Sequence, residues 1–123
     1  MPITHKIDVG RRIIFTRAFG IVTDSELFEY HTNLPSAPDF DPSFNLLSDF
    51  TEVTKWDVQS STVHRIASIP LFGDSSLRAI VAGSDVIFGH VRMFLTLRDI
   101  DPNNLRVFRD LNEARKWLGL DKI

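Results

Sequence analysis

The sequence contains no cysteine, which excludes disulfide bonds, thiolate metal sites and cysteine nucleophiles and fits a reducing, cytoplasmic environment. It also lacks a basic excess, since 14 Lys and Arg residues stand against 16 Asp and Glu residues. Proteins that bind nucleic acids usually carry such an excess, so we predict no nucleic-acid partner. No apolar run approaches the roughly 20 residues of a membrane span, and no signal peptide is visible at the N-terminus. We therefore predict no membrane span.

Glycine-rich nucleotide-binding motifs are absent as well. The sequence has neither Gly-x-Gly-x-x-Gly nor a Walker loop. Gly83 and Ser84 lie between a predicted strand and a predicted helix, but the following Asp85 would repel a phosphate there. The histidines lie on different predicted elements, without the i, i+4 spacing of a helical metal site: His5, His31, His64 and His90. We expect no metal site, no cofactor and no enzymatic activity.

The sequence does have ample apolar material. Hydrophobic residues make up 43% of the 123 residues and ten are Phe, enough for one core in a single domain over residues 1–123. Apolar residues alternate over 13–21, which predicts a strand, and the turn at Gly10 joins it to a short strand at 3–7. Thr23 and Glu26 have the spacing of a capping box and predict the start of a helix that Pro35 ends.

The rest of the chain alternates between strand and helix patterns. The expected elements are a stiff proline-rich loop at 35–42, a strand at 44–49, a helix capped by Asp57, a strand at 77–83, a helix at 87–97, a strand at 105–108 and a helix that follows Asp110. The near-continuous apolar run at 77–83 is typical of a strand buried on both faces. The order ββαβαβαβα predicts an α/β fold with a five-stranded, mostly parallel mixed sheet and four helices.

Polar residues near the end of the third predicted strand form the first candidate site. Sites in such sheets lie at the carboxyl ends of strands, which draws attention to Asp49, Thr51, Thr54 and Asp57. The alternative, which we favour, is that Asp57 caps a helix and the threonines are loop residues. Trp56 stands in a polar stretch, where an exposed tryptophan would indicate a contact surface.

Aromatic and sulfur-containing side chains on the predicted helix at 87–97 form the second candidate site. Phe88, Met93 and Phe94 would line an apolar pocket in a ligand carrier, although such a stripe is more often plain core. The exposed face of this helix is also a candidate dimer surface, so a homodimer stays open.

Several short sequence segments, together with the order of the elements, make the chain resemble proteins of the SpoIIAA-like fold. This fold comprises the STAS (anti-sigma-factor antagonist) domains and related small bacterial proteins. These segments are FGIVT at 19–23, NLLSD at 45–49, FGHVRMF at 88–94 and VFRDL at 107–111. The resemblance implies a non-enzymatic regulatory module that binds a protein partner, with a phosphorylatable serine after the third strand. Asp49 matches the aspartate of that motif, whereas Phe50 stands at the serine position and the glycine is absent. The implied partner-binding or phospho-switch face comprises Asp49, Thr51, Thr54, Trp56, Asp57, Ser60 and Ser61.

Another branch of the same fold is similar to lipid-carrier domains with an apolar cavity between helices and sheet. That likeness implies a small apolar ligand, a pocket at Phe88, Met93 and Phe94, and the loop at 35–42 as a lid. A ligand carrier is therefore the second functional hypothesis.

Overall fold

The computed structural model describes residues 2–120, which form an α/β fold around one mixed sheet. The elements are β1 (Ile3–Asp8), β2 (Ile13–Thr23), α1 (Asp24–Asn33), the short 3-10 helix η1 (Leu34–Ser36), β3 (Asn45–Asp57), α2 (Ser60–Ala67), β4 (Arg78–Ala82), α3 (Asp85–Arg98), β5 (Leu105–Phe108) and α4 (Leu111–Trp117). The strands lie in the order β1-β2-β3-β4-β5, with β1 antiparallel to β2 and all other neighbours parallel. The predicted five-stranded, mostly parallel mixed sheet with four helices is confirmed.

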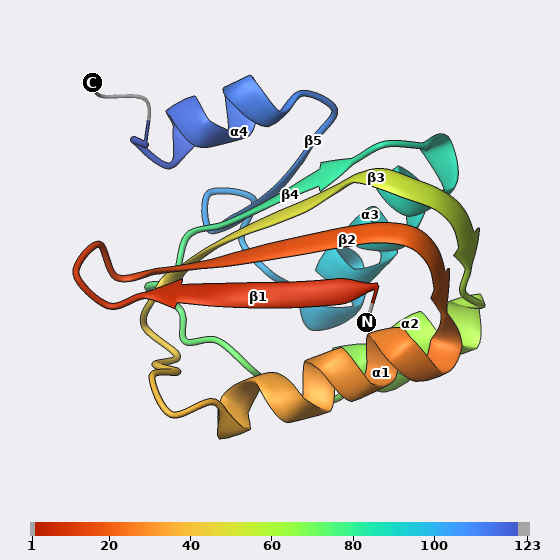
Figure 1. The fold of residues 1–123 in the computed structure, drawn as a ribbon, viewed down its shortest axis with the longest axis horizontal. Helices are drawn as coiled ribbons and strands as arrows, with labels where there is room; N and C mark the ends of the chain where they lie inside the picture. The colour runs from red at the N-terminus through yellow and green to blue at the C-terminus, as the bar shows by residue number, and fades with distance from the viewer. Residues whose placement is uncertain (1, 121–123) are drawn as a thin grey trace.

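The helices cover the two faces of the sheet unequally. Figure 1 shows α4 alone on one side of the sheet, whereas α1, α2 and α3 lie on the other side. Side chains alternate along β3, so Leu46 and Phe50 face the three helices while Leu47 and Asp49 face α4. The period of two thus places apolar packing on both faces, with one cluster of buried side chains on the α4 side and two on the three-helix side.

Helix α1 begins at the predicted capping box and is tied to the start of α2. Thr23 Oγ1 accepts a hydrogen bond from Glu26 N at 3.4 Å, and Glu26 Oε1 accepts one from Thr23 N at 3.0 Å. The neighbouring Asp24 Oδ1 accepts from Gln59 N at 2.9 Å and from Thr62 Oγ1 at 2.6 Å. Two helices on the same face are therefore held together where both begin.

Strand β3 is longer than predicted, and the expected role of Asp57 is wrong. The predicted strand ended at Asp49, but β3 continues to Asp57 because it stays paired with β2 as far as Thr23. The register shifts twice along this pair, between Arg17 and Phe19 and between Gly20 and Ile21, and at each shift β3 has one residue more than β2. Helix α2 then begins with Gln59 as its N-cap, without a side-chain cap bond.

Side-chain caps mark the starts of α3 and α4. Ser84 Oγ accepts from Ile87 N at 3.3 Å at the start of α3, and Asp110 caps α4 through Asn112 N at 3.0 Å. After α4, Gly119 takes a φ of 74°, and Leu120 N donates across the stop. Among the described residues, no helix is both long enough and apolar enough to cross a bilayer.

Candidate functional site: an apolar cavity between the sheet and three helices

A cavity of about 110 Å³ lies between the sheet and helices α1, α2 and α3. Leu27 from α1, Ile66 from α2 and Phe94 from α3 line it on the helical side, and Leu46 and Phe50 from β3 line it on the sheet side. One face of each element points into it because the helices repeat every 3.6 residues and the strands every two. Its volume is of the order of the roughly 150 Å³ cavity that admits benzene in another protein.

Polar side chains gather at two places along this cavity. Those that line it are Tyr30, His31, Ser48, Arg78, His90 and Arg98. His90 and Arg98 both lie on α3, and their positions in the sequence put them about 12 Å apart along the helix axis. One end of the cavity therefore carries a histidine and a tryptophan, and the other carries two arginines.

The first polar group joins Trp56 of β3 to His90 of α3. Trp56 Nε1 donates to His90 Nδ1 at 2.9 Å, and the indole ring packs on Phe50 with ring centroids 5.7 Å apart. Burial lowers the pKa of His90, against the opposing charge of Asp24, so the neutral ring that accepts from Trp56 is favoured. The proton of that ring is then on Nε2, which lies 3.5 Å from Ser60 Oγ.

The second polar group centres on Arg78, the first residue of β4. This arginine is only 7% exposed, although its side chain carries a charge. Its Nε is enclosed and is the single such side-chain nitrogen or oxygen in residues 2–120 without a hydrogen-bond partner. Its guanidinium lies over the ring of Phe72, 5.6 Å from the centroid. Burial lowers the pKa of Arg78, the nearby charge of Arg98 lowers it further, and Asp74 opposes both.

Arg98 and His31 complete the second group. Arg98 Nη1 donates to Ala67 O at 3.3 Å, and His31 Nε2 lies 3.2 Å from Ile69 O. Burial lowers the pKa of His31, the bond to Ile69 opposes this, and the charge of Arg98 adds to the lowering. The neutral imidazole therefore donates to Ile69, and its ring meets the edge of Phe94 at a centroid distance of 6.3 Å. The positive charge at this end of the cavity belongs to the two arginines.

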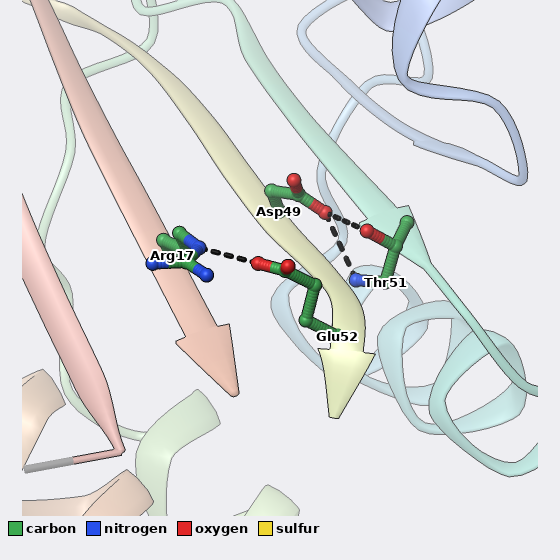
Figure 2. Close-up of polar contacts among 4 residues, drawn as sticks. All are labelled: Arg17, Asp49, Thr51 and Glu52. Atoms are coloured by element: carbon green, nitrogen blue, oxygen red, sulfur yellow. Dashed lines mark hydrogen bonds and ion pairs between the residues drawn. The ribbon is translucent and has the colours of Figure 1, made fainter. Parts of the chain in front are cut away.

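The structure divides the predicted partner-binding face between the two sides of the sheet. Trp56 is half-buried and points into the cavity rather than outward, and Ser60 lies beside it at His90. Figure 2 shows a separate pair in which Asp49 Oδ1 accepts from Thr51 N at 2.9 Å and from Thr51 Oγ1 at 2.6 Å. The remaining three members of the predicted face are exposed and join neither group: Thr54, Asp57 and Ser61.

Asp49 faces a second hollow, of about 280 Å³, on the α4 side of the sheet. His5 of β1 and Arg17 of β2 share this hollow with it, and Figure 2 shows Arg17 ion-paired with Glu52 of β3. No hydrogen bond joins Asp49 to His5 in the described part of the chain. Nor do residues 2–120 contain a group of three or more His, Cys, Asp and Glu side chains placed to hold a metal ion.

The predicted apolar pocket on α3 is represented in the cavity by Phe94 alone. Phe88 packs under the guanidinium of Arg109, 4.5 Å from the ring centroid, and Met93 packs against the core beside the cavity without lining it. Sequence reasoning did not single out Arg78. The feature that could have identified it is a charged residue inside the run at 77–83, which was predicted to be buried on both faces.

Comparison with known proteins does not assign a family. No protein-family model matches the chain, and a search of curated proteins finds no match. The resemblance to the SpoIIAA-like fold therefore stays a prediction, and function has to be inferred from the cavity and the side chains around it.

Proposed function

We propose that this protein is a non-enzymatic binding domain that holds a small, mainly apolar molecule in the cavity between its sheet and helices α1, α2 and α3. The observation that carries the proposal is the cavity itself, about 110 Å³ in volume and lined by side chains from both layers. Pockets for small ligands combine an apolar lining with a few placed polar groups, and this cavity has both.

The cavity lowers the stability of the protein when it is empty. At roughly 24 cal/mol per Å³ of unfilled volume, an enclosed void of about 110 Å³ would cost about 2–3 kcal/mol, which is an upper bound here because the cavity is partly open. A larger side chain at Ser48, which is 3% exposed and lines the cavity from β3, would fill part of it. Filling the cavity should therefore stabilise the protein, which provides a way to test whether the space is used for binding.

The lining also indicates the shape of the ligand. Tyr30, Phe50, Trp56 and Phe94 present aromatic rings to the cavity, and such rings pack well against flat or branched apolar groups. The volume limits the part of the ligand inside to roughly the size of a benzene ring. We therefore expect a compact molecule rather than a long-chain lipid.

Toluene tests the proposal, because it matches the cavity in size and has no polar group. We expect it to shift the NMR signals of residues around the cavity in the unmodified protein and in Ser48→Ala, which leaves the space open. Ser48→Leu fills the space, so it should abolish the toluene response and unfold at a higher denaturant concentration than Ser48→Ala. If toluene causes no shifts and Ser48→Leu is the less stable of the two variants, the proposal is wrong.

Native mass spectrometry of the protein purified from its own host would detect a natural ligand that stays bound. An added mass that disappears on denaturation would identify the molecule. Repeating the measurement on Ser48→Leu gives the control, because a molecule held in the cavity should be missing from that variant.

A regulatory module that binds a protein partner remains the second hypothesis. It has less support, because Asp49 and Trp56 lie on opposite sides of the sheet. The carboxylate of Asp24 also already occupies the start of α2, where a phosphate on Ser60 would have to lie. Capture of a partner by the unmodified protein, lost in Trp56→Ala but not in Ser48→Leu, would favour this hypothesis over ligand binding.

A further inference from the structure

We infer that the ligand carries a carboxylate, which pairs with the guanidinium of Arg78 at the end of the cavity where Arg98 also lies. This inference rests on the proposed function and specifies its ligand as a small organic monocarboxylate with an apolar body.

Arg78 lines the cavity, and its guanidinium forms no ion pair with the described residues. The residue is 7% exposed, and among the described residues no side-chain hydrogen bond or ion pair involves its guanidinium. The ring of Phe72 lies against it but offers no acceptor in the plane of the Nε–H. A buried donor is normally paired, because its loss of hydration is costly, and none of the described residues gives Nε an acceptor.

The surroundings of Arg78 favour a single negative charge. The guanidinium of Arg98 lines the same cavity and forms no ion pair within residues 2–120. Asp74, which acts on Arg78 from a distance, does not reach ion-pair contact with it. His31 is committed to Ile69 O as a neutral donor. Two cations at one end of an apolar space therefore attract an anion, and no carboxylate among residues 2–120 is in ion-pair contact with either of them.

The position of the arginines orients the ligand. Arg78 is at the start of β4, whereas Phe50 and Trp56 line the cavity farther along the sheet, near His90. A ligand whose carboxylate meets Arg78 would direct its apolar body toward those rings. The planar fork of an arginine matches the two oxygens of a carboxylate, and a doubly charged phosphate would be more costly to strip of water.

Isothermal titration calorimetry with three probes tests this inference: toluene, benzoate and phenyl phosphate. These probes share the ring and differ only in the group attached to it. The proteins are the unmodified chain, Arg78→Met, which keeps the length of the side chain without its charge, and Arg106→Met as the matched control. Arg106 is on β5 but packs over Trp117 on the α4 side, away from the cavity.

We expect benzoate to bind the unmodified protein more than about tenfold more tightly than toluene. Arg78→Met should lose that advantage while still binding toluene, which also shows that the variant is folded. Arg106→Met should behave like the unmodified protein.

The other outcomes separate this inference from the proposed function. Toluene binding without any preference for benzoate would overturn the carboxylate and leave the cavity as a binding site. Tighter binding of phenyl phosphate than of benzoate would also overturn it, in favour of a phosphate group. An equal loss of benzoate affinity in Arg106→Met would assign the effect to overall charge rather than to Arg78. Binding of none of the probes would reject the proposed function as well.

Discussion

Arg78 is the position at which stability of the fold and the proposed binding of a carboxylate make opposite demands. As a residue Arg78 is only 7% exposed, and its enclosed Nε has no acceptor among the described residues. An uncompensated charge in a protein interior costs several kcal/mol even after the surroundings relax. The charge of Arg78 should therefore destabilise the protein without a ligand and should stabilise a complex with the proposed carboxylate.

Replacing Arg78 with methionine should accordingly stabilise the empty protein. The variant keeps the packing of the aliphatic stem and removes the unpaired charge, so we expect the free energy of unfolding to rise by about 1–3 kcal/mol. Urea denaturation followed by circular dichroism measures this change. Arg106→Met serves as the control and should stay within about 0.5 kcal/mol of the unmodified protein. A loss of stability in Arg78→Met would mean that Arg78 has a structural role in the empty protein.

His31 makes the stability of the fold depend on pH below about 6.5. Burial lowers its pKa in the folded protein below the value of 6.5 typical of the unfolded chain. Between these two pKa values the unfolded chain binds more protons, so stability falls as the pH drops below about 6.5. His90, whose pKa is also lowered by burial, acts in the same direction.

We therefore expect the urea midpoint to fall between pH 7.5 and pH 5.5 in the unmodified protein, and to fall less in His31→Asn. The exposed His64 on α2 provides the control, since His64→Asn should keep the full pH dependence. If both variants change with pH as the unmodified protein does, burial of His31 is not the cause.

The turn from β4 to α3 depends on a close approach between two strands. A Cβ atom at Gly83 would lie 3.0 Å from Thr51 Cα and 3.3 Å from Phe50 O, both of them backbone atoms of β3. Gly89 within α3 is exposed, and a Cβ atom there would meet nothing within 4 Å beyond the backbone of its own helix. Gly83 is therefore required by the close approach of β3, whereas Gly89 is at a position that has room for a side chain.

We expect Gly83→Ala to lower the free energy of unfolding by about 1–3 kcal/mol, because the backbone of β3 would have to move. Gly89→Ala should raise it by roughly 0.5–1 kcal/mol, because alanine favours the helix. Thermal or urea denaturation of the two variants measures both changes, and a neutral Gly83→Ala would show that the strands separate easily at this point.

The elements that could be predicted from the sequence are those whose causes are local. The capping box at Thr23 and the buried run that became β4 depend only on neighbouring residues. The end of β3 and the start of α2 could not be predicted in this way. Asp57 has the residue type of a helix cap, but β2 keeps it in the sheet, and α2 receives its acceptor from Asp24 on another helix.

The cavity could not be predicted because no single segment contains it. Its lining comes from α1, α2, α3 and three strands, so it exists only after the sheet and three helices have packed. The predicted pocket on the helix at 87–97 did include Phe94, which lines the cavity. An aromatic stripe alone, however, does not distinguish a pocket from a core. Arg78 would have been the most informative residue, because its charge conflicts with the burial that its neighbours predict, but the sequence analysis did not single it out.

The molecule has a separate core on each face of its one sheet, and a tryptophan reports on each. Trp56 belongs to the three-helix side and Trp117 to the α4 side. If residues 1–123 form the predicted single domain, both cores should unfold together.

Trp117→Phe leaves Trp56 as the only tryptophan, and Trp56→Phe leaves Trp117. In each variant we expect the urea midpoint from fluorescence to coincide with that from circular dichroism. The circular dichroism serves as an internal control for any loss of stability in either variant. Separate midpoints would show that the α4 side unfolds independently and that two cooperative units are present.

The cavity should also make the stability of the protein sensitive to hydrostatic pressure. Water fills internal voids when a protein unfolds, so the volume of the system decreases, typically by roughly 20–100 mL/mol, and compression favours the unfolded chain. The empty protein, with about 110 Å³ unfilled, should yield to pressure more readily than a close-packed protein of its length. A ligand in the cavity removes the void. The same chain would then unfold at a lower pressure without a ligand than with a ligand in the cavity.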